Sequence, residues 1–322
     1  MPGPEYPEIE LALLSSAMSG DVGGLYRIAS DLMDNGVPFD DLLFDYLMAT
    51  ERSVGRRWAQ GDYLIAEEHA VTAAIETVIA LLVGLFDQPK DAPLVVIATA
   101  EGDLHSLPAR AIAAHLVFLG YRTNFLGASV PGPDMRDFLE SEQPAALVLS
   151  AAMTTHLVGA REVIAAAHEV GVPVVAGGKA FGPDGAWATA VGADAYVGSL
   201  REVADVVERW AEDAGTDLEP VPPVPPGLKA LVAGRSAVLA EVESALGEEG
   251  ARALGEAGLL LSSIEGALLT GDDTVIADML AWQSEMSRAH GFDASAVADA
   301  VAAALEGVSE EAAAAFSRAR GG

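Results

Sequence analysis

Apolar residues recur every three or four positions from Ile9 to about Phe86, a spacing typical of amphipathic helices. Gly20, residues 36–38 and Gly61 interrupt this pattern at intervals. Glycine and proline at such positions end helices, so the breaks divide the segment into four predicted helices. We therefore expect residues 1–88 to form a four-helix bundle.

From Ala92 onward the pattern changes to short, continuous apolar runs that alternate with helical stretches. Strands with this composition are buried on both faces, and their alternation with helices predicts a parallel, doubly wound sheet. We expect residues 89–214 to form this α/β domain. The predicted strands are Leu94–Ala98, Thr123–Leu126, Ala146–Leu149, Val172–Val175 and Ala195–Gly198.

The chain changes character again after the α/β domain. Residues 215–227 are too rich in proline for a helix or a central strand, which favours an extended, semi-rigid linker. Residues 228–322 are rich in Ala, Leu and Glu with isolated glycines, which predicts a third, all-helical domain. The predicted fold class is thus α/β combined with all-α.

Charge and composition exclude several classes of partner and site. The chain of 322 residues has 18 Lys and Arg against 48 Asp and Glu, a net charge of -30 that disfavours nucleic acids and anionic membranes. Cysteine is absent, which excludes disulfides, thiolate catalysis, cysteine-ligated zinc and thioether-linked chromophores. Because we find neither a basic leader nor an apolar run of about 20 residues, we expect a cytoplasmic protein.

The loop after the first predicted strand carries candidate metal chemistry. Residues 99–108 lack the Gly-x-Gly-x-x-Gly turn of a dinucleotide fold. Asp103 precedes His105 by two residues, which suits a metal ligand whose second ring nitrogen is held by a carboxylate. A loop histidine without any ligand is the alternative. Ser150 and the Gly177–Gly178 pair follow two further strands, and should lie at the same edge of the sheet.

This combination resembles the Rossmann-like (flavodoxin-like) cobalamin-binding domain, whose pattern is Asp-x-His-x-x-Gly, then Ser-x-Leu or Ser-x-Thr, then Gly-Gly. Pro108 replaces the motif glycine and Ala152 replaces the Leu or Thr. The resemblance implies that His105 is the lower axial ligand of cobalt and that Asp103 orients it. The residues implied to line the channel for the nucleotide tail are Ser150, Thr154, Gly177 and Gly178.

A carboxylate interrupts the apolar stripe of the last bundle helix, which we expect to begin near Asp62. Glu68 falls on this stripe and should point inward, where an unpaired carboxylate is costly. One interpretation is that a polar group of a ligand partners Glu68. The other is that Glu68 and His69 pair with Arg56 or Arg57 at the edge of the bundle.

Trp58 followed by Glu68–His69 resembles the upper-face signature of CarH-like cobalamin-dependent photoreceptors, and the resemblance spans roughly residues 8–214. It implies that adenosylcobalamin binds with Trp58 over the adenosyl group and Glu68 on its ribose, with His69 beside them. Light would then cleave the cobalt–carbon bond and change bundle packing and self-association. Some relatives have a cobalt-capping histidine directly after the tryptophan, whereas this chain has Ala59. His69 or His156 could supply the cap instead, or water could remain on the cobalt.

The photocobilin subgroup of these photoreceptors carries a bilin beside the cobalamin, and this chain is similar to it in size and in lacking a DNA-binding module. Biliverdin would bind non-covalently here, because cysteine is absent. Residues of one predicted helix that could contact it are Trp282, Met286, Arg288 and His290, with Phe292 just beyond. The alternative is a core tryptophan with exposed Arg and His side chains.

The sequence therefore predicts a light sensor rather than an enzyme, with no catalytic residues and an unidentified downstream protein partner. One alternative is a corrinoid shuttle subunit of a cobalamin-dependent methyltransferase, in which Trp58 would cover a methyl group. Another is a haem-binding relative of the same domain.

Overall fold

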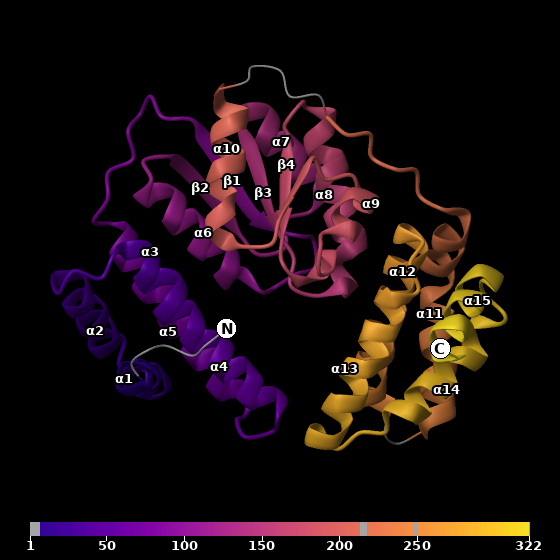
Figure 1. Cartoon of the computed structure of the whole chain (residues 1–322). Coiled ribbons are helices and arrows are strands. Elements are labelled where there is room, and N and C mark those ends of the chain that lie inside the picture. Colours follow the sequence, from indigo (N-terminus) through magenta and orange to yellow (C-terminus); the bar gives the residue numbers. More distant parts are fainter. Residues whose placement is uncertain (1–6, 213–217, 248–249, 322) are drawn as a thin grey trace.

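The computed structural model describes residues 7–212, 218–247 and 250–321, which form three domains in chain order (Figure 1). A helical N-terminal domain and a helical C-terminal domain flank a central α/β domain. The helices of the N-terminal domain are α1 (Pro7–Met18), α2 (Val22–Asp34), α3 (Phe39–Asp41), the π-helix η1 (Leu42–Leu47), α4 (Met48–Ala59) and α5 (Ile65–Val83).

The helical character of the N-terminal domain agrees with the sequence pattern, but a regular four-helix bundle is not confirmed. The third helical segment changes its winding, because α3 continues into the π-helix η1 before α4 begins. Leu42, Leu43 and Phe44 are consecutive and all buried. A regular amphipathic α-helix buries only one narrow stripe of side chains. Three consecutive buried residues form a broader apolar face, and this face coincides with the i→i+5 winding of the π-helix.

Helix α5 begins at Ile65, later than the predicted start near Asp62. The Asp62 N–H donates to the Arg57 carbonyl at 2.9 Å, so Asp62 completes the end of α4. At the start of α5, the Glu67 carboxylate accepts a hydrogen bond of 2.7 Å from the Leu64 N–H. Leu64 is consequently 70% exposed instead of leading a buried stripe.

The central domain is a parallel five-stranded sheet in the order β2-β1-β3-β4-β5, as the alternating pattern predicts. One face packs on α6 and α10, and the other packs on α7, α8 and α9. Its elements are β1 (Leu94–Thr99), α6 (Ser106–Phe118), β2 (Arg122–Gly127), α7 (Gly132–Glu142), β3 (Ala146–Ser150), η2 (Thr154–His156), α8 (Leu157–Glu169), β4 (Val174–Gly177), η3 (Lys179–Phe181), α9 (Ala186–Val191), β5 (Ala195–Val197), η4 (Leu200–Glu202) and α10 (Val203–Glu212).

The linker lies along the α/β domain and leads into the C-terminal helices. Arg161 donates from Nε and Nη2 to the Pro222 carbonyl at 3.1 and 2.8 Å, which holds the linker against the domain. Residues 215–217 of the predicted linker lie outside the described residues. The C-terminal helices are α11 (Pro226–Leu246), α12 (Gly250–Thr270), α13 (Thr274–His290), α14 (Ala294–Leu305) and α15 (Glu310–Gly321).

One stretch of α12, Ala253–Thr270, is long and apolar enough to cross a membrane, with a mean hydropathy of 1.2. However, 56% of this stretch is buried inside the protein. A helix at the centre of a folded domain has the same composition, so the stretch is weak evidence for a membrane span.

Candidate functional site

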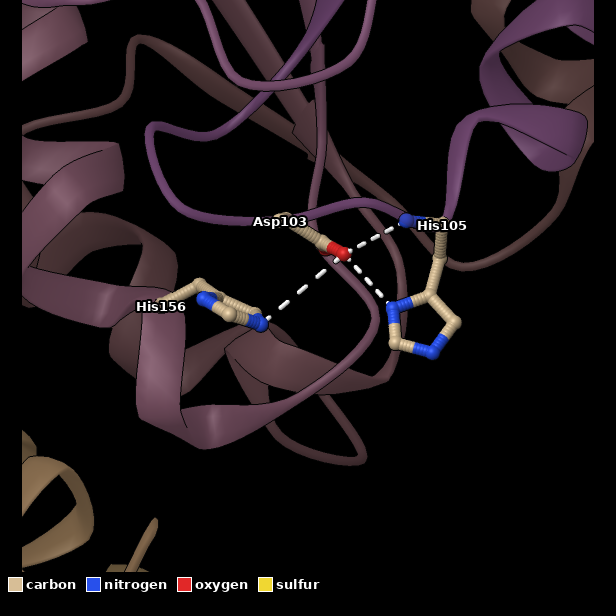
Figure 2. A group of neighbouring side chains, drawn as sticks. All are labelled: Asp103, His105 and His156. Carbon is tan, nitrogen blue, oxygen red and sulfur yellow. Dashed lines mark hydrogen bonds and ion pairs between the residues drawn. The ribbon is translucent and has the colours of Figure 1, made fainter. Parts of the chain in front are cut away.

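The loop after β1 holds Asp103 and His105 in a fixed arrangement (Figure 2). The buried Asp103 carboxylate accepts from His105 Nδ1 at 2.7 Å and from the His105 backbone N–H at 2.9 Å. Its second oxygen accepts from the Ala152 N–H at 2.6 Å. Since Nδ1 donates to the carboxylate, the lone pair of the imidazole is on Nε2, which points away from Asp103. His105 can therefore present Nε2 to a metal ion.

Hydrogen bonding sets the charge of this pair. The hydrogen bond that His105 donates to Asp103, together with the negative charge of Asp103, raises the pKa of His105 against the opposing effect of burial. Burial alone would raise the pKa of Asp103, but the hydrogen bonds from His105 and Ala152 lower it below its ordinary value. Asp103 is thus an anion that three N–H groups hold in place.

His156 is a third member of this cluster, which the sequence did not place beside Asp103. Its Nε2 lies 3.9 Å from Asp103 Oδ1, and only 18% of its side chain is exposed. Burial lowers the pKa of His156, the charge of Asp103 opposes this effect, and the charge of His105 adds to it. Ligating atoms of Asp103, His105 and His156 all lie within 4.8 Å of one another. Its position six residues after Ser150, beyond the same strand end, is the signal that could have revealed it.

The ends of β3 and β4 meet beside this loop. Ser150 is buried and lies opposite both Thr99 of β1 and Gly177 of β4 in the sheet. Gly178 has a φ of +111°, and a Cβ at this position would overlap the Ala151 carbonyl oxygen. The two strand ends can approach this closely only because Gly178 has no side chain.

The next loop contributes two threonines near the same edge. The hydroxyl of Thr154 lies 3.4 Å from the hydroxyl of Ser263 in α12, so the C-terminal domain reaches this loop. Thr155 Oγ1 is buried and has no hydrogen-bond partner among the described residues. A buried hydroxyl without a partner is costly unless a ligand or water satisfies it.

Helices α4 and α5 face this edge of the sheet with two carboxylates. The negative charges of Glu51 and Glu68 both raise the pKa of His105. Burial raises the pKa of Glu51, and the nearby charge of Glu68 raises it further. Glu51 also lies within electrostatic reach of Lys179, directly after Gly178. The sequence did not indicate Glu51, because nothing in its local pattern distinguishes it from a solvated helix residue.

Glu68 has partners within its own helix. His69 Nδ1 donates to Glu68 Oε2 at 2.6 Å, and Thr72 Oγ1 donates to Glu68 Oε1 at 3.0 Å. Neither the pairing with Arg56 or Arg57 nor a polar ligand is needed to satisfy this carboxylate. The His69 side chain is 72% exposed at the same place.

Trp58 lies on the face of α4 that carries Glu51. Glu51, Gly55 and Trp58 are spaced by four and three residues, so they share one face of the helix. A Cβ added at Gly55 would meet no atom within 4 Å, so this face is open between the two larger residues. The Trp58 ring packs against the ring of His290 from α13, with 5.3 Å between ring centroids.

Comparison with known proteins identifies the two domains that form the site. Two family models, each described as a B12 binding domain, match residues 9–83 and 93–218. Trimethylamine corrinoid protein 1 of Methanosarcina mazei is 28% identical over 190 residues, which cover 56% of this chain and 87% of that protein. Dimethylamine corrinoid protein 3 of Methanosarcina acetivorans is 31% identical over 177 residues, which cover 52% of this chain and 80% of that protein.

The fold comparison agrees with these matches. The structure of the Methanosarcina barkeri monomethylamine corrinoid protein superposes with a TM-score of 0.54 at 23% identity, covering 63% of this chain and 99% of that one. Helices α11–α15 lie beyond the residues that the two family models match.

The expectation of a light sensor is wrong. The relatives are methylamine corrinoid proteins, and they favour the alternative of a corrinoid shuttle over a photoreceptor. Two features explain why the tryptophan–glutamate pattern misled. Glu68 is satisfied by His69 and Thr72 without an adenosyl ribose, and Trp58 packs on His290.

The structure and the relatives give no support for biliverdin or for the adenosyl form of the cofactor. Met286 is 3% exposed, and Trp282 packs against the apolar core that the C-terminal helices share. These two side chains therefore fill their own domain, which is the ordinary role of such residues in an amphipathic helix.

Proposed function

The chain belongs to the family of B12-binding corrinoid proteins, and we propose that it carries cobalamin as a methyl-group shuttle, the corrinoid subunit of a methyltransferase system. The observation that carries this proposal is the Asp103–His105 pair, which leaves a histidine Nε2 free beside the ends of β1, β3 and β4. The names of the relatives make methylated amines the donors to test first.

The described residues fit a corrin with a nucleotide tail. His105 offers one nitrogen to the cobalt, and its partner Asp103 fixes the ring orientation. The unsatisfied Thr155 hydroxyl is available to a polar group of the tail. The open space at Gly55 leaves room beside α4. The residues proposed to line the tail channel are Ser150, Thr154, Gly177 and Gly178.

Bound cobalamin supplies a cobalt atom that accepts a methyl group from one substrate and gives it to another. The chain's own residues hold and protect this group. His105 would hold the cobalt through Nε2, and the hydrogen bond to Asp103 makes its imidazole a stronger donor. Trp58 of α4, with Glu68 and His69 near the start of α5, would lie on the side of the site that the N-terminal domain covers and would limit access of water. A carrier of this kind needs no catalytic residue, because the methyltransferases supply the acid–base chemistry.

A binding competition tests the cofactor assignment. The full-length protein is incubated in darkness with equal amounts of methylcobalamin and adenosylcobalamin, and the retained form is identified by chromatography. We expect methylcobalamin to be retained, and His105→Ala to weaken binding at least about tenfold. His168→Ala is the matched control, because His168 also pairs with a carboxylate, that of Asp194 at 2.8 Å. Preferential retention of adenosylcobalamin would contradict the proposal.

A methyl-transfer assay tests the reaction. The loaded protein is reduced with titanium(III) citrate, treated with carbon-13 methyl iodide and then given a thiol acceptor. NMR should show the label first on the protein-bound cofactor, and on the thiol only after a methyltransferase is added. A bound cofactor that never takes up the label would rule out a methyl carrier.

A further inference from the structure

The C-terminal domain is firmly attached to the α/β domain. Buried side chains of α11–α15 and of the β3–β4 side of the sheet belong to one continuous apolar core. Gly266 of α12 packs against the Leu157 side chain and the Thr154 carbonyl, where a Cβ would come within 3.2 and 3.3 Å. Trp187 Nε1 also donates to Asp272 at 2.9 Å. These contacts fix the domain beside the candidate site.

The N-terminal domain is attached to the α/β domain separately, on the other side of the site. Its core includes three residues of α6, namely Leu107, Ala111 and Ala114. Ser106, which follows His105 directly, donates to the Glu76 carboxylate of α5 at 2.6 Å. The α/β domain therefore supports both flanking domains independently (Figure 1).

The two flanking domains touch each other where α4 and α13 end. Trp58 packs on His290, and a Cβ built on Gly61 would lie 3.4 Å from both the Cβ and the carbonyl oxygen of Ala289. We call these four residues the closing contact. His290 Nε2 is buried there without a hydrogen-bond partner among the described residues. Burying an unsatisfied nitrogen costs free energy, so the closing contact is easier to separate than the apolar interfaces.

The position of the closing contact relates it to the site. Trp58 shares a helix face with Glu51, whose charge acts on His105. The closing contact thus lies at the C-terminal end of the α4 face whose other end, at Glu51, is near His105. With it formed, the three domains make a closed ring around this face and the ends of β1, β3 and β4.

We propose that the closing contact is a gate to the upper side of the corrin site, which must separate before cobalamin enters or a protein partner reaches the cobalt. This proposal rests on the proposed placement of cobalamin over His105. Two of its four residues, Ala289 and His290, belong to the C-terminal domain, which lies beyond the family matches.

A reversible cross-link tests the gate. The chain has no cysteine, so Gly61→Cys with Ala289→Cys creates one defined pair. The 3.4 Å between the two Cβ positions is close to the separation of about 3.5–4.5 Å in disulfides. Uptake of hydroxocobalamin is followed by absorption in the oxidised variant, in the reduced variant capped with N-ethylmaleimide, and in the unmodified protein.

The expected order of uptake rates is capped variant, then unmodified protein, then oxidised variant. If the open state is populated at about 10%, His290→Ala can speed uptake by up to about tenfold, and oxidation should slow uptake by at least about tenfold. Equal rates in the oxidised and unmodified proteins would overturn the gate. Failure of the unmodified protein to take up cobalamin would instead overturn the proposed function on which the gate rests.

A trapping measurement separates closure from misfolding. The variant is loaded with hydroxocobalamin first and oxidised afterwards, and release of the cofactor into excess apo-protein is measured. A working gate holds the cofactor until the disulfide is reduced. Release that is equally fast before and after reduction would overturn the gate, because a folded, loaded site would then be accessible with the contact locked.

Discussion

His105 Nδ1 donates to Asp103 Oδ1 at 2.7 Å, and this bond decides which ring nitrogen can bind a metal ion. The same bond raises the pKa of His105 above its ordinary value. The pKa of His105 is higher in the folded protein than in the unfolded chain, where it is about 6.5. The Asp103–His105 interaction therefore stabilises the fold fully at pH values below about 6.5, and this stabilisation is lost as the pH rises through the folded pKa.

Replacing Asp103 with Asn should therefore lower the pKa of His105 toward its ordinary value. An NMR titration of the apo-protein measures this pKa directly, and His105 should titrate above about 6.5 in the unmodified chain. His115 of α6 serves as the internal control, since burial lowers its pKa and Asp103 is not among the groups that shift it. If His105 titrates at the same pH with and without the Asp103 carboxylate, the hydrogen bond does not set its charge.

The close approach at Gly178 predicts an unusually severe effect of a single methyl group. Gly178→Ala places a Cβ against the Ala151 carbonyl in addition to backbone strain of about 1–3 kcal/mol. Gly120→Ala is the matched control, because Gly120 has a φ of +89° with no atom within 4 Å of an added Cβ. Urea denaturation should show the larger loss of stability for Gly178→Ala. Equal losses in the two variants would mean that the loops can separate freely.

Arg201 joins the α/β domain to the N-terminal domain through charge. Its guanidinium lies 2.7 Å from Asp40, 2.8 Å from Asp45 and 3.0 Å from Asp41. These groups are partly exposed, so Arg201→Ala should cost only about 1 kcal/mol, and less at high salt because ions screen exposed pairs. Thermal denaturation at low and high salt measures the effect, with the exposed Arg136→Ala as control. A salt-independent loss would point to packing of the Arg201 stem instead.

The hydrogen bond between Trp187 and Asp272 stabilises the docking of the C-terminal domain on the α/β domain. Trp187→Phe keeps most of the buried ring but removes the 2.9 Å hydrogen bond to Asp272, which should cost about 0.5–1.5 kcal/mol in the free energy of unfolding. Hydrogen bonds from Thr274 and Trp187 lower the pKa of Asp272, so its stabilisation is lost as the pH falls through the folded pKa. Urea denaturation of both proteins near neutral pH and in acid checks this, because the variant should lose less stability in acid.

The sheet was predictable from the sequence because each strand has its own recognisable pattern of apolar residues. Short continuous apolar runs such as Ala146–Leu149 are typical of strands buried on both faces, and the structure has β3 at Ala146–Ser150. The position of the ligand edge followed from the rule that parallel strands present their carboxyl ends together. Asp103 and His105 consequently meet in the structure as their spacing suggested.

Other features depend on contacts between distant segments, which periodicity does not reveal. The π-helix at Leu42–Leu47 reads like any apolar helix, and the contact of Trp58 with His290 joins two domains that are far apart in the chain. The predicted photoreceptor failed for a related reason. Whether Glu68 needs a ligand depends on how its neighbours His69 and Thr72 are oriented, and only the structure shows that they satisfy it.

Electron paramagnetic resonance of the cobalt(II) form tests the central claim most directly, with histidine alone labelled with nitrogen-15. A nitrogen ligand below cobalt splits each cobalt line into three when the nitrogen is the common isotope and into two when it is nitrogen-15. The proposed ligation by His105 Nε2 predicts a two-line pattern in the labelled protein, and its loss in His105→Ala. A three-line pattern in the labelled protein would show that the cofactor's own benzimidazole remains bound, and would contradict His105 as the ligand that holds the shuttle's cobalt.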